Sequence, residues 1–267
     1  MKRRAVIMIR AQPHYRRDAF ESGLLKSGFQ VLPSIENPQP GDVLLTWNRY
    51  GASAFAASVY EKAGAQTLVV ENGYFGRDSQ GRALYSIHNK MLHGYGSWYV
   101  GQEDRFEKFD IKLENWRRGG DHALVFQQRG IGTPPVSSPP EHANVLASKI
   151  KTCANITARI RKHPGDNAPP ISLESDLSGA LFAATHTSSA GLKAMAMGVP
   201  VVTTAEKWLG IPAAMDVSKF DDAAWRGIEG KLIRSDSARL DVFKRIAWAQ
   251  WTVDEISNGI PFRFMCT

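Results

Sequence analysis

The sequence of 267 residues has little cysteine and no long apolar run. Its two cysteines, Cys153 and Cys266, are too few for a disulfide framework, and they lack the Cys/His spacing of a zinc site. No stretch approaches the roughly 18 uninterrupted apolar residues of a membrane span, and the start of the chain lacks a cleavable leader pattern. We therefore expect a cytoplasmic protein in a reducing compartment, with no membrane span and no structural metal.

Internal repeats and low-complexity tracts are also missing from the sequence. Hydrophobic residues make up 43% and charged residues 22%, which excludes disordered and fibrous classes. The formal charge is +7, and the excess leans toward residues 1–120, with 17 Lys and Arg against 12 Asp and Glu. This charge suits an anionic ligand such as a nucleotide, an anionic glycan or nucleic acid, and an unspecialised basic surface is the alternative.

Residues 1–118 alternate between buried-strand and helix patterns. Val43, Leu44 and Leu45, for example, form the continuous apolar run of a strand that is covered on both faces. Such strands, separated by helices, form parallel sheets, and we expect residues 72–99 to form loops over the strand ends. The expected strands are 5–9, 30–35, 41–47 and 66–70, and the expected helices are 15–27 and 52–63.

Residues 119–267 resume this alternation. The expected strands are 123–127, 156–160, 181–185 and 199–203, and the expected helices are 142–153, 190–197 and 237–256. The last of these helices has aromatic and aliphatic residues at helical spacing and should serve packing. The pattern predicts an α/β protein of two facing Rossmann-like domains with mostly parallel sheets, divided between residues 118 and 119.

One strand–helix–strand segment, residues 185–202, carries the clearest ligand pattern. The strand ends in a Ser/Thr cluster that can cap the helix, and the helix N-terminus attracts phosphate. Gly191 would let a ligand approach the backbone. A plain unit capped by serines is the alternative. The residues that we expect to contact an anion here are Thr187, Ser188, Ser189 and Gly191.

Upstream, Lys162 and His163 follow a strand that ends at the same edge of the sheet. Two cations beside a helix N-terminus form a plausible diphosphate clamp. A turn histidine bonded to backbone is the alternative for His163.

Together these segments resemble a known family. Lys162-His163-Pro164, then Ser188-Ser189, Gly191 and Gly198-Val199-Pro200-Val201, are similar to the nucleotide-sugar half of GT-B-type glycosyltransferases. More narrowly, they resemble the capsule polysaccharide biosynthesis (Kdo-transferase-like) family. The turn Glu71-Asn72-Gly73-Tyr74-Phe75 is similar to the Glu-Asp-Gly-Phe turn of that family. One position departs: Lys193 stands where the family has a Glu that is thought to hold the donor ribose.

The resemblance implies a glycosyltransferase that takes a nucleotide-sugar as co-substrate and needs no further cofactor. Residues 119–267 would hold this donor, with Arg129 in a Gly-containing loop as a further cation and Lys193 beside the ribose. Residues 1–118 would face the acceptor, and the resemblance also implies that the last helix packs against this first domain. Because no DxD-like acidic pair ends a strand, we expect no metal, with the cations and the helix N-terminus balancing the leaving phosphate.

Glu71 is the leading acid/base residue, because it follows a strand and precedes a Gly turn. A solvated turn carboxylate is the alternative. His88 and His93 are second candidates for proton transfer or acceptor binding, and either is equally a loop histidine without a role.

Acceptor contacts are expected from Trp47, Asn48, Arg49 and Tyr74. The alternative is a Trp packed under the interdomain hinge with Arg49 solvated. The acceptor is a glycan or, alternatively, a hydroxylated base in DNA. A hypothesis from another class is a non-catalytic module that binds nucleotide or nucleic acid. The oligomeric state stays open.

Overall fold

The computed structural model describes residues 3–109, 111–166 and 171–266. By its contacts the chain divides into unit 1, Met1–Asp110 with Lys244–Thr267, and unit 2, Ile111–Phe243. The division therefore differs from the boundary that we expected between residues 118 and 119. The chain returns to unit 1 near the end of helix α7 (Asp236–Ala247), and the terminal segment packs there.

Unit 1 is built on a six-stranded sheet in the order β11-β5-β4-β3-β1-β2. β1 to β4 are parallel, as the apolar runs predicted, whereas β5 and β11 run antiparallel to their neighbours. β5 lies within residues 72–99, which we expected to form loops. The strands are β1 (Arg3–Met8), β2 (Phe29–Leu32), β3 (Val43–Trp47), β4 (Gln66–Asn72), β5 (Tyr85–Asn89) and β11 (Gln250–Trp251).

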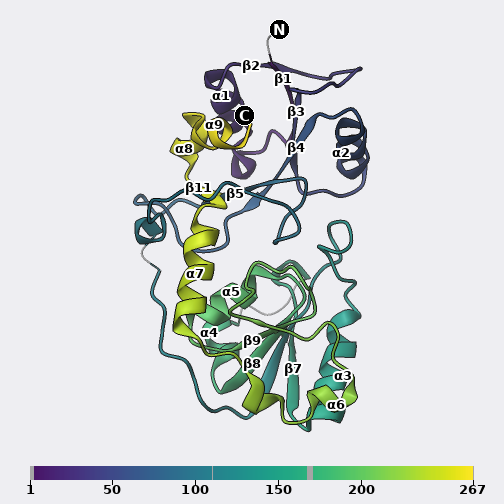
Figure 1. The fold of residues 1–267 in the computed structure, drawn as a ribbon, viewed down its shortest axis with the longest axis vertical. Helices are drawn as coiled ribbons and strands as arrows, with labels where there is room; N and C mark the ends of the chain where they lie inside the picture. Colours follow the sequence, from purple (N-terminus) through teal and green to yellow (C-terminus); the bar gives the residue numbers. More distant parts are fainter. Residues whose placement is uncertain (1–2, 110, 167–170, 267) are drawn as a thin grey trace. The chain divides into compact units, whose positions relative to one another are not determined.

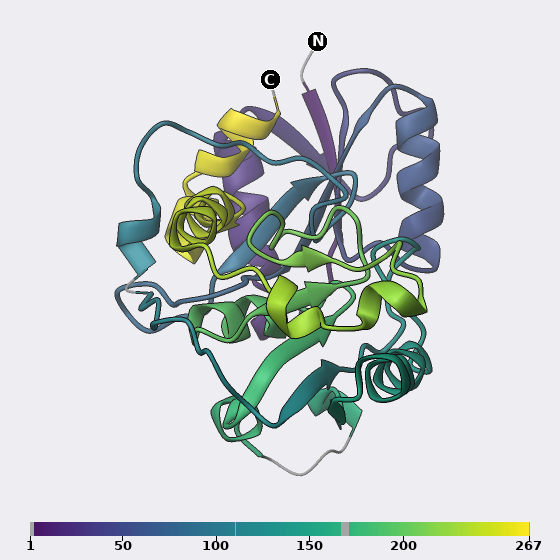
Figure 2. The ribbon, with the colours of Figure 1, turned by 60° about the horizontal axis from the view of Figure 1, so that its bottom comes forward.

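The two faces of this sheet are covered differently. Helices α1 (Arg17–Lys26), α8 (Val253–Ser257) and α9 (Ile260–Met265) gather on one side, and α2 (Ala52–Lys62) lies on the other (Figures 1 and 2). Phe20 and Trp251 are buried in the larger core, which includes residues from all three helices of the first side. α1 and α8 approach closely, since a Cβ on Gly23 would meet the Ile256 carbonyl oxygen at 1.9 Å.

Arg105 attaches the terminal segment to unit 1. This side chain is 3% exposed, and its two Nη atoms each lie 2.6 Å from a carboxylate oxygen of Glu255. It also donates to the carbonyl oxygens of Ala247 and Gln250, both at 3.0 Å. The expected packing of the C-terminus against the first part of the chain is thus confirmed.

Unit 2 has a fully parallel five-stranded sheet in the order β10-β9-β8-β6-β7. β7 lies on one side of β6 and β8 on the other, so the strand order reverses between β6 and β8. In open parallel sheets, ligands bind at the carboxyl ends of the strands beside this point. The strands are β6 (His122–Phe126), β7 (Thr157–Arg161), β8 (Ala180–Thr185), β9 (Val201–Thr203) and β10 (Met215–Asp216).

The helices of unit 2 follow the sequence pattern closely where caps and apolar spacing agree. α5 (Ser189–Ala196) starts after the predicted Ser188 cap, and α3 (His142–Ala154) packs against β7. Unit 2 also contains α4 (Leu173–Leu177) and α6 (Asp222–Trp225), with 3-10 turns at Pro164–Asp166 and Ile228–Lys231. The 3-10 turns of unit 1 lie at Pro13–Tyr15 and Phe106–Phe109. Across the residues that are described, no helix combines the length and the apolar character needed to cross a bilayer.

Candidate functional site

The carboxyl ends of β6 and β8 are joined by a network around Gln128. Its Nε2 donates to Thr187 Oγ1 at 2.9 Å, and its Oε1 accepts from the Thr187 backbone N–H at 3.2 Å and from the Ser138 hydroxyl at 3.1 Å. Thr187 is fully buried and donates its hydroxyl to the Val136 carbonyl. Thr187 therefore holds the loop after β6, which corrects its expected contact with a donor.

The N-terminus of α5 lies at this edge. The Ser188 hydroxyl accepts from the Ala190 N–H at 3.2 Å, while the Ser188 N–H donates to Thr185 Oγ1 at 2.9 Å. Ser188 is thus confirmed as the helix cap. Ser189, half-buried, is the first helical residue. The cap fixes the helix end at the strand edge where an anion is favoured.

Gly191 has a packing role that differs from the expected ligand approach. A Cβ at this position would meet the Trp208 ring at 2.7 Å and Thr185 Cγ2 at 3.2 Å. Trp208 is 1% exposed. The glycine is required because the indole fills the space beside α5.

The predicted cations Arg129 and His163 converge after β6 and β7. A Cβ on Gly165 would lie 2.9 Å from Arg129 Nη1 and 3.2 Å from His163 Nδ1. His163 Nδ1 accepts from the Gly165 N–H at 3.0 Å, and Lys162, at the end of β7, is exposed. Since β7 and β8 flank β6, these cations lie on strand ends beside the α5 cap.

Lys193 is exposed on α5. It faces Glu174, whose pKa is lowered mainly by hydrogen bonds from backbone and the Ser172 hydroxyl, with Lys193 and Arg161 adding to the effect.

A histidine pair at the same edge was not singled out from the sequence. Thr204 Oγ1 lies 2.9 Å from both His142 Nε2 and His186 Nδ1, and His186 Nε2 lies 2.8 Å from the Pro135 carbonyl oxygen. Burial, with the nearby His186, lowers the pKa of His142. The network ties the loop of residues 130–140 to the strand ends through the Pro135 carbonyl. The only sequence signal for it is that His142, His186 and Thr204 are polar residues at the ends of a helix and two strands.

In unit 1, the side chains of Glu71 and His93 form a pair. The sequence predicted each residue separately but not their contact. Glu71 is the sixth residue of β4, and its Oε2 lies 3.1 Å from His93 Nε2. The Glu71 side chain is 30% exposed and that of His93 is 13% exposed. The pair is an accessible carboxylate held by an imidazole, which is the arrangement of a general base with an orienting partner.

Tyr74 and His88 form a second, buried pair beside the first. Tyr74 is 1% and His88 0% exposed, and Tyr74 Oη lies 2.8 Å from His88 Nε2. Burial, with His93 nearby, lowers the pKa of His88 to about 3. Burial also raises the pKa of Tyr74, and the charge of Glu71 adds to this. Neither side chain reaches solvent, so Tyr74 as acceptor contact and His88 as acceptor or proton-transfer residue are corrected.

The other expected acceptor residues lie after β3. Trp47 is half-buried and packs edge-on to Tyr15, with ring centroids 4.6 Å apart. Asn48 takes a left-handed backbone with φ of 58°. Arg49 is engaged by Glu61 through both Nη atoms, at 2.6 and 3.0 Å. Arg49 is therefore a half-buried, ion-paired residue that joins the end of β3 to α2, and not the solvated side chain of the alternative; its contact with an acceptor stays a prediction.

Gln250 of β11 supports the Glu71 turn from the terminal segment. It is fully buried, its Oε1 accepts from the N–H groups of Tyr74 and Phe75 at 2.9 and 3.2 Å, and its Nε2 donates to the Phe75 carbonyl at 2.8 Å. The terminal segment thus fixes the turn that follows Glu71. No local sequence signal marks this contact, because Gln250 lies 176 residues after Tyr74 and 175 residues after Phe75.

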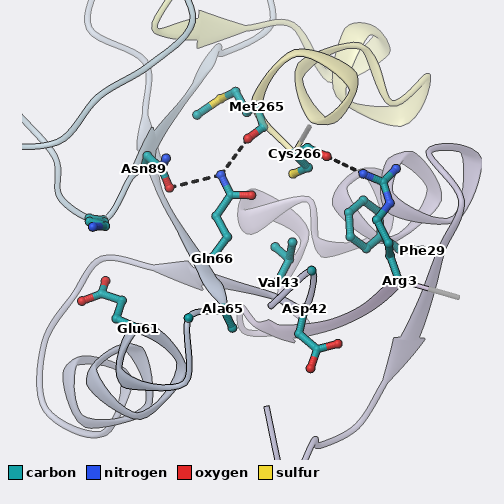
Figure 3. A pocket seen from close by; sticks show the side chains of 13 residues that line it. Arg3, Phe29, Asp42, Val43, Glu61, Ala65, Gln66, Asn89, Met265 and Cys266 are labelled. Atoms are coloured by element: carbon teal, nitrogen blue, oxygen red, sulfur yellow. Dashed lines mark hydrogen bonds between the residues drawn. The ribbon is translucent and has the colours of Figure 1, made fainter. Parts of the chain in front are cut away.

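A pocket of about 550 Å³ lies at the opposite, amino-terminal edge of the unit 1 strands (Figure 3). Its polar groups are engaged with one another: Gln66 Nε2 donates to the Met265 carbonyl at 2.7 Å and to Asn89 Oδ1 at 3.2 Å. The Arg3 guanidinium lies over the Phe29 ring, 4.4 Å from its centroid. Because parallel sheets bind ligands at their carboxyl edge, this pocket is not the candidate site.

Comparisons with known proteins bear on the fold. No protein-family profile matches the chain, and no curated protein matches it. Two solved structures of Thermosulfurimonas dismutans KpsC are similar over nearly the whole chain. The beta Kdo 2,4 transferase has a TM-score of 0.51 at 12% identity, covering 93% of this chain and 91% of that one. The beta Kdo 2,7 transferase has a TM-score of 0.54 at 12% identity, covering 96% and 97%.

The chain has the fold of these Kdo transferases. The fold that the family resemblance implied, an α/β protein with two Rossmann-like units and mostly parallel sheets, is thereby confirmed. Among residues 3–109, 111–166 and 171–266, no group of three or more His, Cys, Asp or Glu side chains is arranged to hold a metal ion.

Proposed function

We propose that this protein is a glycosyltransferase that moves a sugar from a nucleotide-sugar donor to an acceptor hydroxyl. The observation that carries the proposal is the cluster at the carboxyl edge of unit 2, where a Ser-capped helix N-terminus and the cationic side chains of Arg129 and Lys162 follow neighbouring strands. The fold supports it, since the similar structures are Kdo transferases by title. A DNA acceptor has no comparable support.

In this proposal unit 2 binds the donor phosphate. The α5 N-terminus, which Ser188 caps, presents the positive end of a helix dipole beside Ser189. Lys162 supplies a point charge and Arg129 supplies a planar set of donors, while His163, whose Nδ1 accepts from the Gly165 N–H, can donate from Nε2. These groups stabilise the negative charge that grows on the phosphate as the bond to the sugar breaks. No metal ion or further cofactor is required for this role.

Glu71 acts on the acceptor in the same proposal. Its carboxylate takes the proton of the acceptor hydroxyl while the oxygen bonds to the anomeric carbon, and the phosphate leaves with the electron pair of the broken bond. His93 holds one carboxylate oxygen, at 3.1 Å. The net charge of +7 fits an anionic glycan as acceptor, and the proposal assigns the reaction to polysaccharide biosynthesis in the cytoplasm.

Thermal unfolding in the presence of nucleotides tests the donor site. The pure protein is heated with millimolar UDP, CMP, GDP or dTDP and with their sugars, with EDTA in a parallel series. We expect one nucleotide class to raise the unfolding midpoint, with or without EDTA, because a ligand that binds only the native state stabilises it by mass action.

Two lysine variants make this test specific. Lys162→Ala should reduce the nucleotide-induced shift, while Lys149→Ala, which removes a half-buried lysine of α3 that pairs with Asp222 at 3.7 Å, should leave it unchanged. No shift with any nucleotide, or equal shifts in both variants, would contradict the donor site. Loss of the shift in EDTA alone would contradict metal independence.

A further inference from the structure

Three polar side chains form a row across the sheet of unit 1. Glu71 on β4 lies opposite Ser86 on β5, and Ser86 lies opposite Gln250 on β11. Directly opposed residues of antiparallel strands share one face of the sheet, so the three side chains lie on the same face. Ser86 and Gln250 are 0% exposed, whereas the Glu71 side chain is 30% exposed. The row therefore leads from the buried terminal segment to the accessible carboxylate.

The Gln250 amide is fixed by hydrogen bonds whose donors and acceptors are unambiguous. Its Oε1 accepts from the backbone N–H groups of Tyr74 and Phe75, at 2.9 and 3.2 Å, and its Nε2 donates to the Phe75 carbonyl oxygen at 2.8 Å. A backbone N–H only donates and a carbonyl oxygen only accepts, so the amide has one possible orientation. Gln250 and Tyr74 are 0% and 1% exposed. Solvent therefore does not reach these bonds, and their loss carries the full desolvation cost of the backbone groups.

The turn that receives these bonds lies just beyond the last contact between β4 and the start of β5. The Gly73 N–H donates to the Leu84 carbonyl oxygen at 2.7 Å, and a Cβ on Gly73 would lie 2.7 Å from Leu84 Cβ. The N–H groups of the next two residues, Tyr74 and Phe75, bond to the Gln250 side chain. Gln250 thus continues the hydrogen bonding of the strand into the turn.

This turn affects the position of the proposed base in two ways. It follows Glu71 directly, so a shift of residues 72–75 moves the end of the strand that carries the carboxylate. It also carries the Tyr74 ring, which packs edge-on against the His93 ring with centroids 5.8 Å apart. His93 Nε2 in turn lies 3.1 Å from Glu71 Oε2. A fixed turn therefore keeps the carboxylate and its imidazole partner aligned.

The backbone of Gln250 is itself held on both sides. The Ala249 carbonyl oxygen accepts from the Ile87 N–H of β5 at 3.0 Å, and the Gln250 carbonyl oxygen accepts from Arg105 Nη2, also at 3.0 Å. Arg105 is 3% exposed and is bound through both Nη atoms by Glu255 of α8. The amide therefore projects from a rigid support, which the positioning of another group requires.

We propose that Gln250 is a positioning residue for the transfer reaction: its buried amide fixes the turn after Glu71, so that Glu71 and His93 stay aligned for proton transfer from the acceptor. Gln250 is fully buried, so it acts through the turn and not on the substrate. The proposal rests on the proposed function, in which Glu71 takes the acceptor proton. Its own content is that the terminal segment contributes to turnover as well as to stability.

The variant Gln250→Met keeps the length of the side chain and removes its amide. Transfer is measured from the nucleotide-sugar that raises the unfolding midpoint most to an anionic oligosaccharide. We expect kcat to fall about tenfold while KM for donor and acceptor stays within about twofold, because binding is intact and only the base is misaligned.

The matched control for this variant is Gln66→Met. Gln66 also bonds to the terminal segment, through the Met265 carbonyl oxygen at 2.7 Å. It is the first residue of β4, whereas Glu71 is the sixth. The control should lower the unfolding midpoint and leave kcat unchanged. An equal fall of kcat in both variants would overturn the proposal, because loosening of the terminal segment would then account for the loss.

Gln250→Glu adds a rescue test. A carboxyl oxygen still accepts from the N–H groups of Tyr74 and Phe75, and the neutral acid also donates to the Phe75 carbonyl oxygen. This variant should therefore retain several-fold more kcat than Gln250→Met. Equal losses in the two variants would overturn the proposal. So would wild-type kcat in Gln250→Met, or a fall in kcat accompanied by an equal rise in KM.

Amide hydrogen exchange separates this proposal from the proposed function. The N–H groups of Tyr74 and Phe75 should exchange faster in Gln250→Met and at the wild-type rate in Gln66→Met, because only the first variant removes the acceptor oxygen. If the wild-type protein transfers no sugar from any donor, the proposed function fails, and the exchange comparison still tests the hold on the turn. Unchanged exchange at both positions in Gln250→Met overturns the positioning role whether or not the protein is active.

Discussion

The two sheets bury polar side chains in different places. In unit 2 the buried threonines of the sheet, Thr185 and Thr203, are the last residues of β8 and β9, at the edge where the donor is proposed to bind. In unit 1 buried polar groups also lie within the strands, as Thr67, Ser86 and His88 do. Polar groups at strand ends cap helices and loops, whereas polar groups inside strands displace apolar packing and cost stability.

This difference indicates a division of labour. Unit 2 has a capped helix N-terminus with Lys162 and Arg129 after neighbouring strands, which suits binding of phosphate. In unit 1 the buried polar residues Ser86 and His88 lie on the face of the sheet that carries Glu71. If so, variants in unit 1 should change turnover, and variants in unit 2 should change donor binding.

The largest effect is expected from Glu71→Gln. The amide has the shape of the carboxylate but cannot take a proton, so kcat should fall about 10²- to 10⁴-fold. The nucleotide-induced rise in the unfolding midpoint, which depends on unit 2, should be unchanged. Steady-state transfer rates and thermal unfolding of the same preparation measure the two. An unchanged transfer rate would remove Glu71 from the mechanism. Loss of the midpoint shift would contradict the assignment of donor binding to unit 2 alone.

The sequence predicted the parts of the fold that local patterns encode. β1, β3, β6 and β8 are continuous apolar runs, and the Ser188 cap follows from residue type and position. β5 was missed because its alternation, with Tyr85 and Ile87 on the apolar face, is short and lies among loop-forming residues. β11 was missed because it has two residues between helices.

The candidate site was predicted only where a residue type acts alone. Glu71 at a strand end and Lys162 after β7 were found in this way. Tyr74 and Gly191 were assigned to ligands, although His88 and Trp208 are their partners. Such partners are set by the packing of the whole unit, and residue type alone does not distinguish a ligand contact from a buried one.

A second prediction concerns the cost of the polar face. The pKa of His88 falls from 6.5 to about 3 on folding, because burial and then His93 disfavour its charged form. The folded state therefore loses stability as the pH drops below about 6.5, by up to about 1.4 kcal/mol per pH unit, or about 2–3 kcal/mol at pH 4.5. Urea unfolding at pH 7.5 and 4.5 measures this loss.

The matched variants for this experiment are His88→Gln and His14→Gln. The Gln at position 88 can still accept from the Tyr74 phenol and does not titrate, so this variant should lose about 2–3 kcal/mol less than the wild type between the two pH values. His14 is exposed, and its variant should behave as the wild type. Equal losses in all three proteins would show that burying His88 carries no such cost.

The smallest effect tests the apolar packing of unit 2. Gly191→Ala places a Cβ 2.7 Å from the Trp208 ring, and overpacking of this kind costs about 1–3 kcal/mol, partly offset by the better helix propensity of Ala. A Cβ on Gly230 meets nothing within 4 Å, so Gly230→Ala is the control and should lower the unfolding midpoint little or not at all. If Gly191 instead serves ligand approach, its variant would keep the wild-type midpoint and lose the nucleotide-induced shift. That result would return the glycine to the donor site and weaken the contrast between the two sheets.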